Sequence, residues 1–193
     1  MTQNTSLQLP SPVLMDMSLT RALGRRRSER TFAAQPVDPA ILAAVLWACA
    51  GQNDACGKRT VPTARDLRSV DAYVFDERGV FLYHPDTNTL EKLAGEDARA
   101  ATTTGQPFVA EAPVSVVFIG DNVKAQPLSE PMRERCLALD AGCMMQSALL
   151  ACAAMGLSAV ARASCPQQAP CRAAGLDENR YVVLGAVTLG FPA

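Results

Sequence analysis

One stretch of the sequence, from Cys136 to Leu157, constrains the fold more than any other because it is long, apolar and rich in alanine. Ser129 is a suitable N-cap for a helix here, Pro131 suits the first turn, and Gly156 supplies a C-terminal stop. The stretch is a poor membrane span because it is interrupted by Asp140, Gly142, Gln146 and Ser147. The sequence therefore predicts one long helix, buried on most sides at the centre of the domain or against a second subunit, and no membrane partner.

The other segments predict a mixture of helices and strands. A short helix is expected from Ser18 to Arg27, and a better specified one begins at Asp38, a good N-cap followed by Pro39, and stops at Gly51. Residues 51–66 lack periodicity and are expected to form a loop, whose length suggests a function. The further expected elements are a β-hairpin of strands 71–75 and 80–84, a helical region 90–101, strands 114–119, 158–163 and 181–189, and a short helix 167–174.

Strands and helices thus alternate without a regular βαβ pattern, which indicates an α+β fold with helices covering a sheet. The length of 193 residues suits one domain, expected over residues 18–193. Residues 1–17 are expected to be a flexible polar lead-in. Their beginning, MTQNTSLQLPSPV, lacks the basic start and apolar run of a secretory signal.

Charge and cysteine content exclude several classes of protein. Lys plus Arg number 18 and Asp plus Glu 19, so no global basic field indicates a nucleic-acid partner, and any anion binding must be local. The seven cysteines form no Cys-x-x-Cys pair and no Cys/His spacing that would build a metal site. A reduced, cytoplasmic setting is expected, although Cys165 and Cys171 bracket a turn and a redox pair there stays open.

A dense charge cluster, GRRRSERTF, occupies residues 24–32 and places five charged side chains in nine residues. Arg26, Arg27, Ser28 and Arg30 offer guanidinium groups and a hydroxyl that suit a phosphate, because several charge-assisted hydrogen bonds can converge on one dianion. A solvated face of arginines is the alternative that the composition leaves open.

The order of segments favours the anion site. The runs ALGRRRSERTF, DPAILAAVLWACAGQN, GKRTVPTARDLRSVDAYVF, FVAEAPVSVVFIG, LDAGCMMQSALLACAAMGL and YVVLGAVTLGFP together resemble the nitroreductase family of flavoproteins, from about Ser18 to Pro192. The chain is most similar to the SagB-type, azoline-dehydrogenase-like branch. This resemblance implies a nitroreductase-like fold, with a mostly antiparallel central sheet and an intertwined homodimer.

The resemblance also implies that the cofactor is FMN. Its Arg-x-Ser-x-Arg pattern falls on Arg26, Ser28 and Arg30, so that Arg26 and Ser28 would hold the phosphate. Arg27 would contact the ribityl or phosphate region. Arg30 would lie near the N1/O2 edge of the flavin, where a cation raises the reduction potential.

Three further segments carry contacts that the resemblance implies. Pro62, Thr63, Ala64, Asp66 and Arg68 would lie along the pyrimidine edge, with Asp66 and Arg68 standing where Asn and Gln are common in the family. An ionised Asp accepts only, which suits the flavin N3–H; the alternative for this loop is a plain turn. Gln146 would lie beneath the cofactor or be a satisfied core amide, and Ala163 and Ser164, where many members have Glu-Gly, would direct an amide at N5.

No catalytic side chain is expected because the flavin itself accepts and donates electrons. The resemblance implies a homodimeric oxidoreductase in which NADH or NADPH reduces FMN, leaves, and is replaced by a small-molecule electron acceptor such as a nitroaromatic or a quinone. Two alternatives stay open: an azoline-type dehydrogenase acting on a modified peptide, and a flavin-binding protein without turnover.

Overall fold

A single antiparallel sheet forms the centre of the computed structural model, which describes residues 6–13, 15–53 and 56–193. In this part of the chain seven strands lie in the order β1-β4-β3-β2-β5-β7-β6, and every neighbouring pair is antiparallel. The strands are β1 (Ser6–Gln8), β2 (Val70–Asp76), β3 (Gly79–His84), β4 (Thr89–Ala94), β5 (Val114–Asp121), β6 (Ser158–Arg162) and β7 (Tyr181–Gly190). The predicted α+β fold with a mostly antiparallel sheet is confirmed.

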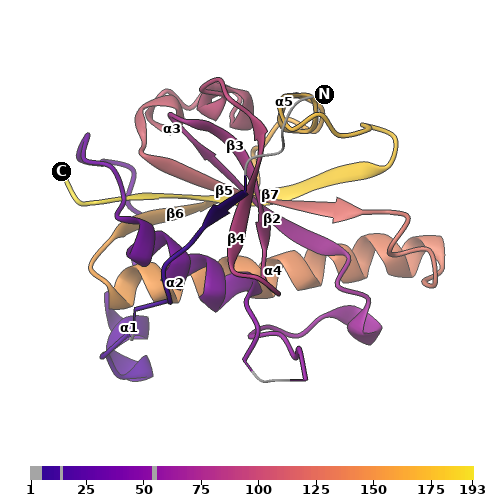
Figure 1. Ribbon diagram of the computed structural model, residues 1–193, viewed down its shortest axis with the longest axis horizontal. Helices are drawn as coiled ribbons and strands as arrows, with labels where there is room; N and C mark the ends of the chain where they lie inside the picture. The colour runs from indigo at the N-terminus through magenta and orange to yellow at the C-terminus, as the bar shows by residue number, and fades with distance from the viewer. Residues whose placement is uncertain (1–5, 14, 54–55) are drawn as a thin grey trace.

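Helices cover both faces of this sheet (Figure 1). The longest, α4 (Glu130–Ala154), runs across one face together with α1 (Leu19–Arg25) and α2 (Pro39–Ala50). The opposite face carries α3 (Phe108–Glu111), α5 (Ala169–Ala173) and the 3₁₀ turn η2 (Arg99–Thr102), while a second 3₁₀ turn, η1 (Ala64–Asp66), lies in the loop after α2. Each face of the sheet therefore has its own apolar core.

The helix α4 is the predicted long helix, and its buried side packs on the sheet and on α2. Met144, Ala148 and Cys152 lie in the same core cluster as Leu46 and Cys49 of α2. By length and composition α4 could cross a membrane, but half of its most apolar window is buried inside the protein, as in the core helix of a globular domain. Burial raises the pKa of the Cys49 thiol to about 12, so this cysteine behaves as a small buried hydrophobe.

The central strand and its neighbours follow the sequence pattern closely. All eight residues of β5 are buried, as expected for a continuous apolar run in the middle of a sheet. The predicted hairpin is present, with β2 and β3 joined by a turn that places Asp76 opposite Gly79. The loop from residue 51 onward is also present, apart from η1 and one isolated bridge between Gln52 and Arg59.

Two expectations about the edge of the sheet are wrong. The region 90–101 is not mainly helical: it begins as β4 and only residues 99–102 turn into η2. Leu90 and Leu93 point into the two opposite cores, which is the alternation of a strand, and Glu91 contacts His84 of the neighbouring strand. Residues 1–5 and 14 of the expected lead-in lie outside the described residues; its described part is not wholly flexible, because Ser6–Gln8 pairs with β4 and extends the sheet.

The turn between β2 and β3 generates a stability test. Replacing Gly79 by Ala should lower the free energy of unfolding by about 2 kcal/mol or more, because φ is +133° and a Cβ would overlap the carbonyl oxygen of Ala94. Gly24→Ala is the matched control, since a Cβ there meets nothing within 4 Å and Gly24 lies inside α1; it should stabilise the protein by up to about 1 kcal/mol. Urea denaturation measures the free energy of unfolding of both variants. Equal values for the two would contradict the conformation assigned to Gly79.

Candidate functional site

The arginine segment, Arg26–Arg30, leaves the C-terminus of α1 and runs beside the edge strand β6. The Glu29 amide donates a hydrogen bond of 3.0 Å to the Ala159 carbonyl, which fixes the segment on that edge. Arg26 and Arg27 border a hollow of about 230 Å³ that is closed on its other side by the end of α4 and the turn into β6. The segment is exposed except at Arg26, which is half-buried.

The hydrogen-bonding groups of this segment are mostly unused within the described part of the chain. Arg27 is the exception, because its Nη1 donates to the carbonyls of Gly24 and Arg26 at 3.0 and 2.9 Å and so closes the end of α1. Neither the Arg26 nor the Arg30 guanidinium, nor the amides of Arg27, Ser28 and Arg30, bonds to another described residue. Free cations and free amides on one exposed segment suit an anion.

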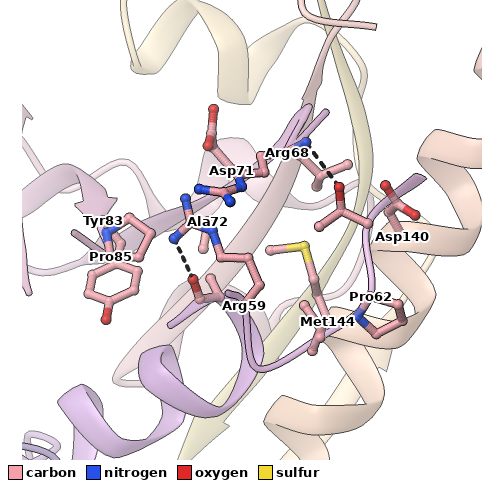
Figure 2. Close-up of a pocket in the computed structure, with 13 residues that line it drawn as sticks. Arg59, Pro62, Arg68, Asp71, Ala72, Tyr83, Pro85, Asp140 and Met144 are labelled. Carbon is pink, nitrogen blue, oxygen red and sulfur yellow. Dashed lines mark hydrogen bonds between the residues drawn. The ribbon is translucent and has the colours of Figure 1, made fainter. Parts of the chain in front are cut away.

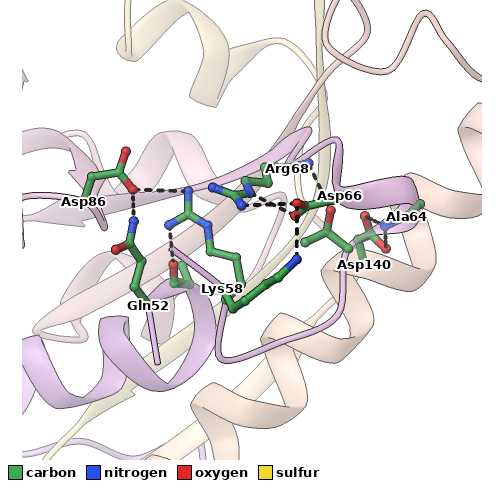
Figure 3. Close-up of polar contacts among 10 residues, drawn as sticks. Gln52, Lys58, Ala64, Asp66, Arg68, Asp86 and Asp140 are labelled. Atoms are coloured by element: carbon green, nitrogen blue, oxygen red, sulfur yellow. Dashed lines mark hydrogen bonds and ion pairs between the residues drawn. The ribbon is translucent and has the colours of Figure 1, made fainter. Parts of the chain in front are cut away.

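The second group of predicted residues lies in the η1 loop, Pro62–Arg68, which α4 holds in place (Figure 3). Both carboxylate oxygens of Asp140 accept from the Ala64 amide, at 3.1 and 3.0 Å. The Thr63 hydroxyl accepts from the Arg68 amide at 3.0 Å and closes the loop. Arg65, Asp66 and Arg68 all have positive φ, of 52°, 57° and 49°, a strained conformation that persists only where surrounding contacts impose it.

Asp66 and Arg68, the two departures from the family pattern, form one unit. The Arg68 Nε and Nη2 donate to the two carboxylate oxygens of Asp66 at 3.0 and 3.3 Å, and the Lys58 ammonium lies 3.8 Å away. The hydrogen bond from Arg68 lowers the pKa of Asp66 below its ordinary value, so this carboxylate is ionised and accepts hydrogen bonds only.

A small cavity lies behind the η1 loop and is too small for an organic cofactor (Figure 2). Its volume is about 30 Å³, which is the room that one or two water molecules occupy. Arg59 lines it, donates to the Ala50 carbonyl at 3.1 Å, and has a pKa lowered by burial. Any larger ligand must therefore bind at the surface of the loop rather than behind it.

The structure does not bring the two groups of predicted residues together within one chain. Figure 1 shows α1 and η1 toward opposite ends of α4. Asp140 lies beside the η1 loop and Ala153 beside the arginine segment. At 1.5 Å per residue they are separated by about 20 Å along the helix axis.

Gln146 lies midway between these two places and is exposed, so it is not the core amide that the sequence left open. It belongs to an exposed stripe of α4 with Leu139, Gly142 and Cys143. The other sides of α4 are buried by its own chain, and burial of this stripe against a second subunit stays a prediction. Ala163 and Ser164 follow β6, are exposed, and the Ser164 amide donates no hydrogen bond to a described residue.

Residues 23–191 match the model of the nitroreductase family. The chain belongs to this family. A nitroreductase-like protein of Ralstonia eutropha has a structure that superposes with a TM-score of 0.91 at 33% identity, over 97% of this chain and 90% of that one.

Two other solved structures share the fold. One is a complex with FMN from Desulfovibrio desulfuricans, at 20% identity and a TM-score of 0.63 over 92% of this chain and 88% of that one. The other is the microcin synthetase complex of Escherichia coli with truncated pro-MccB17 bound, at 17% identity and a TM-score of 0.77 over 95% of this chain and 75% of that one.

The residues of this nitroreductase-family chain fit the flavin that the resemblance implies. The free guanidinium group of Arg26 and the free amides of Arg27 and Ser28 match an anionic tail. The ionised Asp66 offers an acceptor and the Ser164 amide a donor, as the ring requires. In the described part of the chain the two sets line different hollows and are separated along α4.

Arg162 is a buried group that sequence reasoning missed. It ends β6 directly before Ala163, is 3% exposed, and donates to Thr188 Oγ1 at 2.8 Å and to the Thr102 carbonyl at 2.7 Å. Burial lowers its pKa, and it ties η2 to the sheet below the Ala163–Ser164 segment. The signal was present, because strand alternation in SAVAR puts Arg162 on the same face as Val160.

The cysteines near this segment give no support to a redox pair. Cys165 and Cys171 are both free thiols. Burial raises the pKa of each, which makes both thiols less reactive.

The Asp66–Arg68 unit generates a titration test. Replacing Arg68 by Ala should raise the pKa of Asp66 toward its ordinary value, because the hydrogen bonds that hold the carboxylate ionised are removed. Carboxyl ¹³C NMR measures this pKa directly. Lys58→Ala is the control and should raise the pKa of Asp66 less, since the Lys58 ammonium lies 3.8 Å from the carboxylate whereas Arg68 donates two hydrogen bonds to it. Equal shifts in the two variants would contradict the role given to Arg68.

Proposed function

We propose that this nitroreductase-family chain is an FMN-dependent oxidoreductase that uses NADH or NADPH to reduce a small-molecule acceptor such as a nitroaromatic or a quinone. The observation that supports this proposal is the arginine segment, in which the Arg26 and Arg30 guanidinium groups and the amides of Arg27, Ser28 and Arg30 bond to no other described residue. The structure of a similar fold in complex with FMN supports the choice of cofactor. Reductant and acceptor bind in turn at one exposed face. We place the protein in the cytoplasm.

The arginine segment binds the phosphate end of the cofactor in this proposal. Arg26 and Ser28 hold the phosphate with charge-assisted hydrogen bonds, which are about twice as strong as neutral ones. Arg27 contacts the ribityl chain that joins the phosphate to the ring. Its Nη1 also donates to the Gly24 carbonyl and so closes α1. Arg30 places a positive charge at the pyrimidine edge, where it favours negative charge on the ring.

The remaining residues orient the ring. Pro62, Thr63 and Ala64 shape the η1 loop against the pyrimidine edge, Asp66 accepts from the flavin N3–H, and Arg68 keeps Asp66 ionised. The Ser164 amide, next to Ala163, donates toward N5. When bound, FMN supplies a ring that accepts and releases a hydride. The protein binds and orients this ring, and no side chain acts as an acid or a base in the proposal.

A homodimer completes the site in this proposal. Because Gln146 lies midway between Asp140 and Ala153, antiparallel packing of two α4 helices about Gln146 sets the η1 loop of one protomer against the arginine segment of the other. The exposed stripe permits close approach, since Gly142 presents no side chain and nothing lies within 4 Å of the position of its Cβ. The 60% exposure of Leu139 also favours burial in such an interface.

The phosphate assignment makes a quantitative prediction. The double variant Arg26→Ala with Ser28→Ala should bind FMN at least about tenfold more weakly, because charge-assisted hydrogen bonds to the phosphate are lost. Its affinity for riboflavin, which has no phosphate, should be unchanged. Flavin fluorescence titration measures both ligands.

Arg21→Ala is the matched control, because Arg21 is an exposed arginine of α1 that does not line the hollow beside the arginine segment. It should leave the affinities for both flavins unchanged. Equal losses of FMN and riboflavin affinity in the double variant would contradict the phosphate assignment.

The activity is tested by anaerobic stopped-flow absorbance. NADH or NADPH should bleach the flavin absorbance of the FMN-loaded protein, and a nitroaromatic or quinone added afterwards should restore it. If neither nucleotide bleaches the flavin, the proposed use of NAD(P)H is wrong. If the purified protein is colourless and takes up no added FMN, the proposal fails as a whole.

A second candidate function is an azoline-type dehydrogenase acting on a modified peptide within a larger complex. It is favoured by the likeness in fold to the Escherichia coli microcin synthetase complex, whose structure contains truncated pro-MccB17. This candidate requires bound FMN but no response to NADH or NADPH. The stopped-flow experiment therefore separates the two functions.

A further inference from the structure

Asp140 differs from the other buried carboxylates in the described chain. Asp76 and Asp121 are 4% and 1% exposed, and each is paired with an arginine: Arg78 and Arg180, both at 2.6 Å. Asp140 is 8% exposed and makes no ion pair with a described residue. Its hydrogen bonds there come from one group, the backbone amide of Ala64. A buried charge without an opposite charge is costly, so its retention requires a reason.

The charged groups around Asp140 are occupied elsewhere. In the small cavity that Asp140 lines, Arg59 donates to the Ala50 carbonyl (Figure 2) and Arg68 donates to Asp66 (Figure 3). Asp71, in the same cavity, pairs with Lys124 at 2.7 Å. Burial raises the pKa of Asp140, and the hydrogen bond from Ala64 opposes that rise. The Ala64 amide is therefore the contact that favours the ionised form.

The Ala64 amide is also placed where its hydrogen bond can hold the conformation of the η1 loop. It opens η1, and the residues that follow adopt the strained positive φ angles of Arg65, Asp66 and Arg68. The strained conformation needs fixed points at both ends. One is the Asp140 carboxylate, which accepts from the Ala64 amide, and the other is the Thr63 hydroxyl, which accepts from the Arg68 amide. Between them the Arg65 guanidinium donates to the Pro127 carbonyl at 3.1 Å.

We propose that Asp140 is a positioning residue that fixes the η1 loop in the conformation that contacts the flavin ring, through its hydrogen bonds with the Ala64 amide. It contacts neither cofactor nor substrate. The inference rests on the proposed function for the identity of the ligand. The fixing of the loop itself is independent of that function and is tested without flavin.

The first test is limited trypsin digestion of the flavin-free protein. Asp140→Leu, which removes the acceptor at similar volume, should increase the rate of cleavage after Arg65 or Arg68 by about tenfold or more, since a charge-assisted hydrogen bond is lost. Asp140→Asn keeps an acceptor oxygen and should restore most of the protection. An unchanged rate in Asp140→Leu would overturn the proposal.

Two further variants serve as controls for the trypsin test. Asp71→Asn removes a carboxylate from the same cavity without touching η1, and its cleavage rate should equal that of the wild type. Thr63→Ala releases the other fixed point and should increase cleavage even if Asp140→Leu fails to fold. In that case Asp140→Ala, which also removes the acceptor from the Ala64 amide, takes the place of Asp140→Leu, and an unchanged cleavage rate in it would overturn the proposal.

The second test uses the two flavins. Because the η1 loop is assigned to the ring and not to the phosphate, Asp140→Leu should weaken the binding of FMN and riboflavin by the same factor, about tenfold, with Asp140→Asn intermediate. A loss confined to FMN would overturn the assignment of Asp140 to the ring. If the wild type binds no flavin, the proposed function fails, while the trypsin test still decides whether Asp140 fixes the loop.

Discussion

The packing of α4 against the sheet is the interaction on which the rest of the structure depends. The buried side of α4 completes one apolar core with α2 and the sheet, and Asp140 on this helix holds the η1 loop. Its end borders the arginine segment. A single rigid helix therefore sets the separation, about 20 Å, between the two groups of residues that the family pattern assigns to one cofactor. That separation makes a second copy of the chain part of the proposed site.

Local patterns predicted most of the fold. The long helix, the Asp38-capped helix, the β2–β3 hairpin and β5 each carry a periodicity or cap that needs no knowledge of the neighbours. The strands β1 and β4 could not be predicted in this way, because they are polar and lie toward the edge of the sheet. Glu91 suits a helix surface as well as a strand, and only its contact with His84 across the ladder decides between them. The pairing of Ser6–Gln8 likewise depends on a strand more than 80 residues away.

In the candidate site, too, the sequence indicated which residues to consider but not the contacts between them. Charge density and segment order were enough to select Arg26, Ser28 and Arg30, and the departures at Asp66 and Arg68 were visible in the sequence. The contacts that give these residues their geometry are between distant parts of the chain and leave no local signal. The bond between Asp140 and Ala64 spans 76 residues, and that between Arg162 and Thr102 spans 60. Propensity predicts elements, whereas the fixing of a loop is decided by tertiary contacts.

The central claim is that one cofactor is held by the arginine segment of one protomer and the η1 loop of its partner. The most direct measurement is the amount of tightly bound FMN in a purified heterodimer of two differently tagged chains, one with Arg26→Ala and Ser28→Ala, the other with Asp66→Ala and Arg68→Ala. If sites are shared between protomers, both defects fall in one site and the other is intact, so the heterodimer should bind one FMN per dimer with wild-type affinity. If instead both elements act within one chain, each site carries a defect, and a heterodimer without tightly bound FMN would contradict the account.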